Sequence, residues 1–118
     1  MSGTAAIVAL DWPNQVDLRP VGTLVLGGVA ARTKLPVDRV QELGLAVDSL
    51  ARAVAEPQIQ LEIEVAADRL SVLVGPFASD PLQDEGLERV VRALTDEVGH
   101  RERAGASWVS LVVQLPQG

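Results

Sequence analysis

Glu62 and Glu64 are the side chains whose type and spacing come nearest to chemistry in this sequence. Two neighbouring carboxylates can act as a general acid and a general base. Here they alternate with apolar residues, so both are expected on the solvent-facing side of one strand. Carboxylates in that position usually serve solubility, and we interpret the pair as surface charge.

The other reactive residue types are scarce. His100 is the sole histidine and lies in the charged segment HRER, which indicates a surface position. The sequence contains no cysteine, which removes disulfides, thiolate metal sites and cysteine nucleophiles together. We therefore expect no catalytic residue and no metal site.

The charge balance argues against nucleic-acid binding. The formal net charge is −6, and Lys34 is the only lysine beside nine arginines. A negative chain opposes the attraction that drives binding to a phosphate backbone. Trp12, Phe77 and Trp108 are the only aromatic residues, too few for a base-stacking platform.

Length and composition predict a single domain over residues 1–118. The apolar share of 47% is enough for a core, and no apolar run approaches the roughly 18 residues of a membrane helix. The segment MSGTAAIVALDW has no basic region before its apolar residues, so it is expected to form a first strand rather than a signal peptide. We expect a soluble cytoplasmic protein without membrane contact.

The clearest element is a helix over residues 42–56, followed by a strand at 59–65. Pro36 and Asp38 predict a helix start, and Pro57 predicts its end because proline cannot continue the hydrogen-bond ladder. The buried helix stripe is formed by Leu43, Val47, Leu50 and Val54. The buried strand face is formed by Ile59, Leu61, Ile63 and Val65.

The remaining pattern completes an α+β fold. The expected elements are a strand at 5–10, a helix at 14–32 capped by Asn14 or preferably Asp17, a hairpin turn at 67–68, a strand at 70–74, a loop at 75–83, a helix from Asp84 to Gly99, a polar turn at 101–105 and a strand at 107–115. Gly27 and Gly28 are expected to mark close packing or a kink in the first helix. Together these elements predict a two-layer α/β sandwich, with a mixed, mainly antiparallel four-stranded sheet and three helices on one face.

Four short segments, in this order and spacing, carry a resemblance to a known family. They are Leu18-Arg19, Leu45-Ala46-Val47-Asp48, Asp84-Glu85-Gly86-Leu87 and Ala93-Leu94-Thr95-Asp96-Glu97-Val98. With the element order, they make residues 11–115 resemble the anti-sigma-factor serine kinases, which are histidine-kinase-like ATPases of the GHKL, or Bergerat, fold. The resemblance implies bacterial transcription regulation.

The residues that would act on ATP in that family are altered here. The family pattern L-A-V-x-E-x-x-x-N holds a glutamate base and an asparagine that ligates Mg²⁺; this chain has Ser49 and Ala53 there. Serine is no general base at neutral pH, and alanine has no oxygen for a hard cation. Asp48 and Arg52 lie nearby, but each is turned by about 100° from its neighbouring position on the helix.

The second family motif, D-x-G-x-G, is also incomplete. Its acid, which reads adenine, is missing before Gly75-Pro76, and Asp80 comes several residues too late. The closing G-x-G-L of the lid survives only as Gly86-Leu87. The resemblance therefore implies a vestigial nucleotide site at Ser49, Arg52, Ala53, Gly75, Pro76, Gly86 and Leu87.

These losses predict a pseudo-ATPase without a cofactor. A missing charge-assisted hydrogen bond and a missing metal ligand together cost about 3–6 kcal/mol, which turns a micromolar site into a millimolar one. The alternative is an active serine kinase that uses ATP and Mg²⁺ through displaced residues. Ser49, Ala53 and the missing loop acid all argue against that alternative.

Binding of another protein is the leading hypothesis for function. The resemblance implies docking on a sigma factor or an antagonist of an anti-sigma factor, with Arg19 of the first helix in the contact. A homodimer through the face or edge of the sheet is also implied by the family. A structural or dimer-forming domain with unrelated partners fits the sequence equally well.

Overall fold

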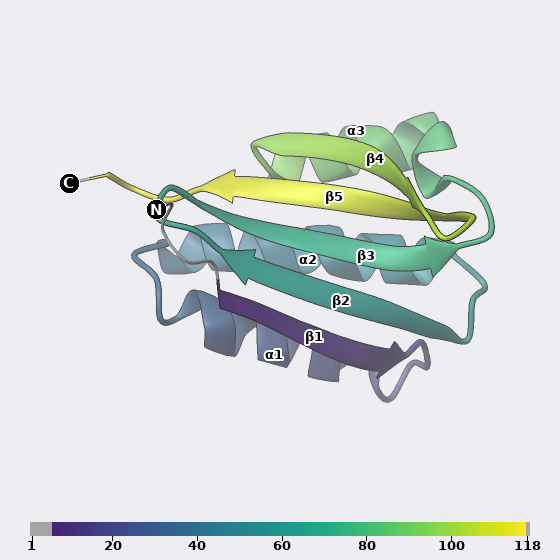
Figure 1. Cartoon of the computed structure of the whole chain (residues 1–118), viewed down its shortest axis with the longest axis horizontal. Helices are drawn as coiled ribbons and strands as arrows, with labels where there is room; N and C mark the ends of the chain where they lie inside the picture. The colour runs from purple at the N-terminus through teal and green to yellow at the C-terminus, as the bar shows by residue number, and fades with distance from the viewer. Residues whose placement is uncertain (1–5, 118) are drawn as a thin grey trace.

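The computed structural model describes residues 6–117, so Ala5 of the expected first strand lies outside the described part. It contains two layers, with one antiparallel sheet covered on one face by three helices (Figure 1). The α+β sandwich expected from the sequence is confirmed. In chain order the elements are β1 (Ala6–Pro13), α1 (Arg19–Ala30), α2 (Val37–Ala53), β2 (Gln58–Val65), β3 (Arg69–Phe77), the 3-10 turn η1 (Pro81–Gln83), α3 (Glu85–Leu94), β4 (Glu97–Arg103) and β5 (Ala106–Gln114).

The sheet has five strands in the order β1-β2-β3-β5-β4, and every pairing is antiparallel. The expectation of four strands in a mixed sheet was wrong. The additional strand is β4, whose residues had been assigned to the end of the third helix and a polar turn. The turn between β4 and β5 is only Ala104-Gly105, and both residues have the positive φ that a tight primed hairpin turn requires.

Helix α3 ends at Leu94, before the predicted end at Gly99. The hydroxyl of Thr95 donates to the carbonyl of Val91 at 2.9 Å, and the amide of Asp96 donates to the carbonyl of Val112 on β5. The chain has thus already joined the sheet at Asp96. At the other end of α3, Asp84 accepts from the amide of Leu87 at 3.1 Å, as expected for its cap.

The hairpin turn at 67–68 is confirmed, but β3 continues past the predicted end at Val74. The expected loop therefore begins after Phe77 rather than at Gly75. The pairing with β5 shifts register between Val74 and Phe77, and the Gly75-Pro76 peptide bond there is cis. This shift allows both Val74 and Phe77 to be buried.

The core lies between the sheet and the helices. Leu43, Val47 and Leu50 of α2 are fully buried, as the helical stripe predicted. They share the core with the inward strand residues Ile59, Leu61, Ile63, Leu70, Val72, Val109, Leu111 and Val113. Val54, Val65 and Leu94, which were expected inside, are only partly buried.

Helix α1 departs from the expectation at its start and at its glycines. It begins at Arg19, and neither Asn14 nor Asp17 caps it. A side chain added at Gly27 or Gly28 would meet no atom within 4 Å, so that pair does not mark close packing. The closely packed glycine is Gly22, whose Cα faces the indole of the buried Trp12.

Asn14 instead joins β1 to the end of α2. Its amide nitrogen donates to the carbonyls of Ala51 and Glu56, each at 3.0 Å, and its backbone amide donates to the carbonyl of Pro57. The bond to Ala51 satisfies a carbonyl that the helix leaves unpaired at its C-terminus, and the other two bonds hold the segment that follows the helix. Helix α2 ends at Ala53, three residues before the end that had been expected.

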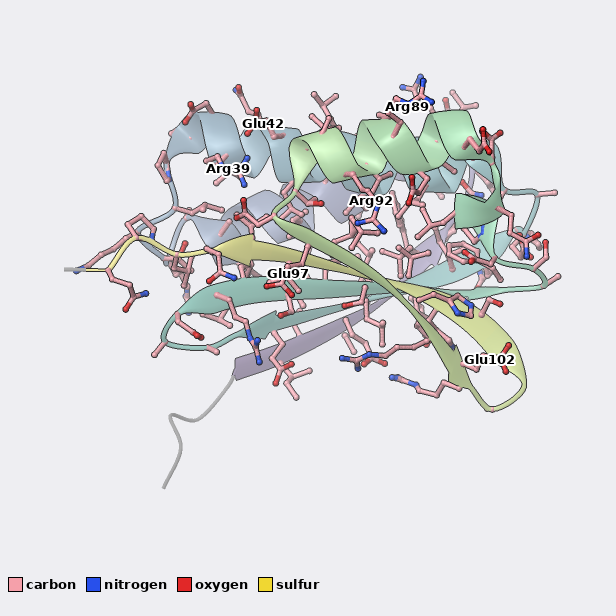
Figure 2. The ribbon with its side chains drawn as sticks, turned by 90° about the horizontal axis from the view of Figure 1, so that it is seen from above. Arg39, Glu42, Arg89, Arg92, Glu97 and Glu102 are labelled. Atoms are coloured by element: carbon pink, nitrogen blue, oxygen red, sulfur yellow. The ribbon has the colours of Figure 1, made fainter. Side chains whose placement is uncertain are left out.

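Arg39 joins α2 to the connection between α3 and β4. Its guanidinium contacts Glu42 at 2.6 Å and Asp96 at 3.1 Å; Figure 2 shows Arg39 and Glu42 on α2. The hydrogen bond that Arg39 donates to Glu42, together with the charge of Asp96, raises the pKa of Arg39 above its usual value. None of the described helices is long and apolar enough to span a membrane.

Candidate partner-binding surface and the expected nucleotide site

A groove lies between α1 and α2 on the solvent side of the helical layer. Its volume is about 870 Å³. Small residues face each other along it: a side chain added at Gly44 would meet Thr23 of α1 only at 3.9 Å. The groove is lined by Val16, Arg19, Pro20, Thr23, Val40, Gln41, Gly44, Leu45, Asp48 and Arg52.

Two large apolar side chains remain exposed in this groove. Val16 is 74% exposed and Leu45 is 56% exposed. Leu45 was named in the family motif, but its exposure was not predicted. The sequence held a signal for it, because Leu45 lies off the buried stripe of Leu43, Val47 and Leu50. Exposed apolar groups of this kind, rimmed by polar ones, are typical of interaction sites.

Arg19, the predicted partner contact, lies at one end of the groove. Its Nε donates to the side-chain oxygen of Asn14 at 3.1 Å, so the stem is held in place. Within residues 6–117 no carboxylate forms an ion pair with it. The guanidinium is therefore held by Asn14 and has no ion-pair partner among the described residues.

Arg52 belongs to this groove and not to the expected nucleotide site. Its Nε pairs with Asp48 at 2.8 Å, one helical turn earlier. Ser49 donates its hydroxyl to the carbonyl of Leu45 at 2.8 Å, a bond within α2. A separate hollow at the end of α2, described next, is lined by neither Ser49 nor Arg52. Both residues had been assigned to the vestigial nucleotide site, and the helix places them outside this hollow.

Ala53 and Leu87 do come together, in a hollow of about 490 Å³ between the end of α2, η1 and the start of α3. The charged side chains in its lining are Glu56, Asp80 and Asp84, and the described lining contains no lysine, arginine or histidine. A polyphosphate placed here would meet three carboxylates and no side-chain cation of the described lining. This electrostatic feature was not predicted from the sequence.

The three carboxylates already have backbone partners. Glu56 accepts from the amide of Ala78 at 2.6 Å, and Asp80 accepts from the amide of Leu82 at 2.9 Å. Asp84 caps α3 as described above. Among residues 6–117 no group of three or more His, Cys, Asp or Glu side chains is placed to hold a metal ion.

The glycine and proline positions of the predicted site do not line the hollow either. Gly75 is on the helix-free face of the sheet, where a side chain would meet the indole of Trp108 at 2.6 Å. Pro76 follows it in β3 and does not line the hollow. Gly86 is exposed in the first turn of α3, beside the Asp84 carboxylate.

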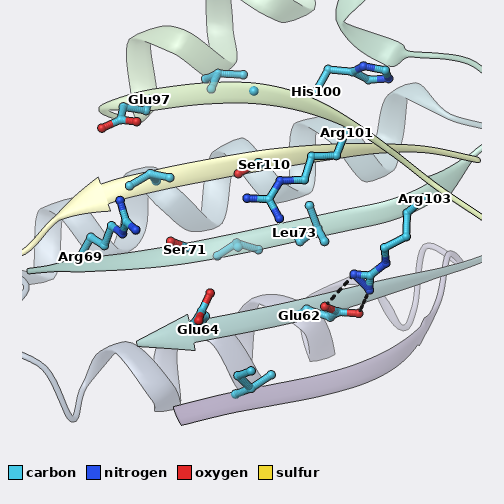
Figure 3. Close-up of a pocket in the computed structure, with 15 residues that line it drawn as sticks. Glu62, Glu64, Arg69, Ser71, Leu73, Glu97, His100, Arg101, Arg103 and Ser110 are labelled. Atoms are coloured by element: carbon cyan, nitrogen blue, oxygen red, sulfur yellow. Dashed lines mark hydrogen bonds and ion pairs between the residues drawn. The ribbon is translucent and has the colours of Figure 1, made fainter. Parts of the chain in front are cut away.

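The helix-free face of the sheet carries a second group of charged residues (Figure 3). Glu62 pairs with Arg103, with one nitrogen–oxygen distance of 3.1 Å, and the Arg103 guanidinium lies 4.5 Å from the ring centre of Trp108. Trp108 is only 5% exposed. Its Nε1 has no hydrogen-bond partner among the described residues. Glu62 is thus held in an ion pair, and His100 is exposed as expected.

A scan of protein-family models finds none that matches the chain, and a search of curated proteins finds no match either.

Proposed function

We propose that this chain is a regulatory protein-binding domain of the anti-sigma-factor type that has lost nucleotide chemistry. It docks a sigma factor, or an antagonist of an anti-sigma factor, in the groove between α1 and α2. The observation that carries the proposal is Arg19, an unpaired cation held by Asn14 at the end of an apolar groove. A cytoplasmic location goes with partners of this kind.

The chemistry of the groove supports docking of a protein rather than of a small polar substrate. Val16 and Leu45 offer apolar contact area, and Arg19 offers a charge that a partner carboxylate can neutralise. Arginine beside exposed apolar groups is a common composition for the centre of an interface. The Asp48–Arg52 pair at the rim adds polar contacts without excess charge.

The kinase alternative receives less support. Its glutamate and asparagine positions hold Ser49 and Ala53, and the hollow beside Ala53 has carboxylates but no cation in its described lining. ATP-dependent phosphoryl transfer requires groups that neutralise phosphate charge. The proposal therefore assigns no catalytic role to any residue of this site.

Arg19→Ala tests the docking proposal. Sigma factors and sigma-regulator proteins of the source cell would be purified and their binding measured by calorimetry. We expect one of them to bind, and the variant to weaken that binding by about 1–2 kcal/mol because an interface arginine is removed. The melting temperature should stay nearly constant, since surface charge contributes little to folding.

Two further variants define the surface. Leu45→Ser should also weaken binding, whereas Arg89→Ala on α3, which is exposed outside the groove, should leave binding unchanged. Equal affinity for the wild-type chain and both groove variants would move the interface elsewhere. Absence of binding by every sigma-related protein would contradict the function itself.

A further inference from the structure

Among residues 6–117, strand β1 forms an open edge of the sheet, since β2 is its only strand neighbour there. Alternate residues of an edge strand direct unpaired N–H and C=O groups outward. Natural edges are usually protected by charges, prolines or bulges. The stretch from Ile7 to Leu10 has none of these, and Ile7 is 65% exposed and Val8 36% exposed.

A hollow of about 450 Å³ lies between this edge and the flank of α1. Its lining is formed by Val8, Val25, Gly28, Val29, Arg32, Thr33 and Val65. Gly28 has no side chain, and a Cβ there would meet nothing within 4 Å, so the entrance stays open. An apolar side chain of a strand added to β1 would find valine contacts here on the helix side of the sheet.

A second hollow of about 320 Å³ continues from the first and shares Arg32, Thr33 and Val65 with it. It adds Lys34, and no aspartate or glutamate belongs to the lining of either hollow. Within residues 6–117 neither Arg32 nor Lys34 forms an ion pair. In a chain of net charge −6, this region is positive and uncompensated.

We propose that the β1 edge is a docking site for an extended acidic segment of another protein, which adds to the sheet as an antiparallel strand. Main-chain hydrogen bonds to β1 would supply affinity, and a side chain in the valine hollow would supply specificity. Ala6 pairs with Val65, so the N-terminal end of β1 lies beside Arg32. The acidic end of an antiparallel segment is therefore its C-terminal end.

The charges favour a foreign acidic strand over a second copy of β1. The only carboxylate on β1 is Asp11, which pairs with Gln60 on the helix-free face. The hollow and Arg32 are on the helix side, so a second β1 would bring no carboxylate from its own strand to Arg32. The site also lies on the opposite flank of α1 from the groove that contains Arg19.

The proposal is tested with a fluorescein-labelled peptide of about eight residues, the length of β1. It alternates valine and threonine, ends in two aspartates and is amidated. Fluorescence anisotropy should show saturable binding that weakens with added salt, because charge contributes to it. A peptide ending in two lysines should bind at least about tenfold more weakly.

Matched variants locate the site. Gly28→Leu should fill the entrance and reduce peptide affinity at least about tenfold, while Gly27→Leu, in the same helix but outside the hollow, should not. Arg32→Glu should weaken binding more than Arg89→Glu, which changes net charge equally. Circular dichroism would verify that each variant is folded.

Several outcomes would overturn the proposal. They are failure of the acidic peptide to bind, equal binding of the acidic and basic peptides, and equal binding by the Gly28→Leu and Gly27→Leu variants. The proposal would also fail if sedimentation showed a dimer that Gly28→Leu disrupts and the acidic peptide does not. The surface would then belong to a second copy of the chain. Binding that survives Arg19→Ala keeps this site distinct from the proposed groove.

Discussion

At the scale of single residues, Gly22 and Gly27 separate two roles of glycine in one helix. Gly22→Ala would drive a methyl group into the indole of Trp12, whose Nε1 donates to the carbonyl of Leu18 at 3.0 Å. We expect a loss of about 1–3 kcal/mol in the free energy of unfolding, as for an overpacked core. Gly27→Ala, which meets no atom, should instead gain about 1 kcal/mol from helix propensity. Urea titration measures both, and equal effects would contradict the packing shown here.

The sequence predicted which residues would be buried on α2 but not which glycine would pack. Periodicity within one helix is a local property, so the stripe of Leu43, Val47 and Leu50 could be recognised from spacing alone. The contact between Gly22 and Trp12 joins two elements across a connection, and no local pattern marks it. The expectation of close packing at Gly27 and Gly28 was wrong for that reason.

At the scale of elements, Asn14 determines how the β1–α1 connection meets the end of α2. Asn14→Ala would leave the carbonyls of Ala51 and Glu56 without their side-chain donor. It would also free the Arg19 side chain. We expect a loss of about 1–3 kcal/mol in urea titration, the range for unsatisfied buried polar groups. Gln15→Ala, next to it and exposed, is the control, and a similar loss for both would exclude this role.

Strand β4 shows why one element of the sheet could not be predicted. Its sequence, EVGHRER, has a single apolar residue, so the alternation that identifies a half-buried strand is absent. Val98 also continued the helical spacing of Leu87, Val91 and Leu94, which favoured a longer α3. The strand forms because β5 offers it a partner along its whole length, a tertiary effect that overrides local propensity.

The candidate site was predictable only in part, for a related reason. The resemblance grouped Ala53 with Leu87, and both line the same hollow. Arg52 was misplaced, because it pairs with Asp48 one turn earlier and lines the groove between α1 and α2. Glu56 follows the end of α2 in the sequence, whereas Asp80 and Asp84 flank η1, and only the fold brings these two to Ala53.

At the scale of the whole molecule, the charge distribution predicts that nucleotide will not stabilise the fold. The hollow that contains Ala53 carries Glu56, Asp80 and Asp84, while the uncompensated cations Arg19 and Arg32 lie in other surfaces. A ligand that binds only the folded state adds RT ln(1 + [L]/Kd) to stability. At about 1 mM Mg-ATP, a micromolar site would add about 4 kcal/mol and a millimolar site only about 0.4.

We therefore expect a thermal-shift experiment with Mg-ATP or Mg-ADP to show almost no change against magnesium sulfate at equal ionic strength. Radiolabelled ATP should transfer no phosphate to a serine of any sigma-regulator protein. The reason is physical: binding would bury phosphate charge beside three carboxylates with no cation from the described lining to offset it. Stabilisation by several degrees in Mg-ATP would reverse this conclusion and favour an active kinase that uses a site other than the hollow beside Ala53.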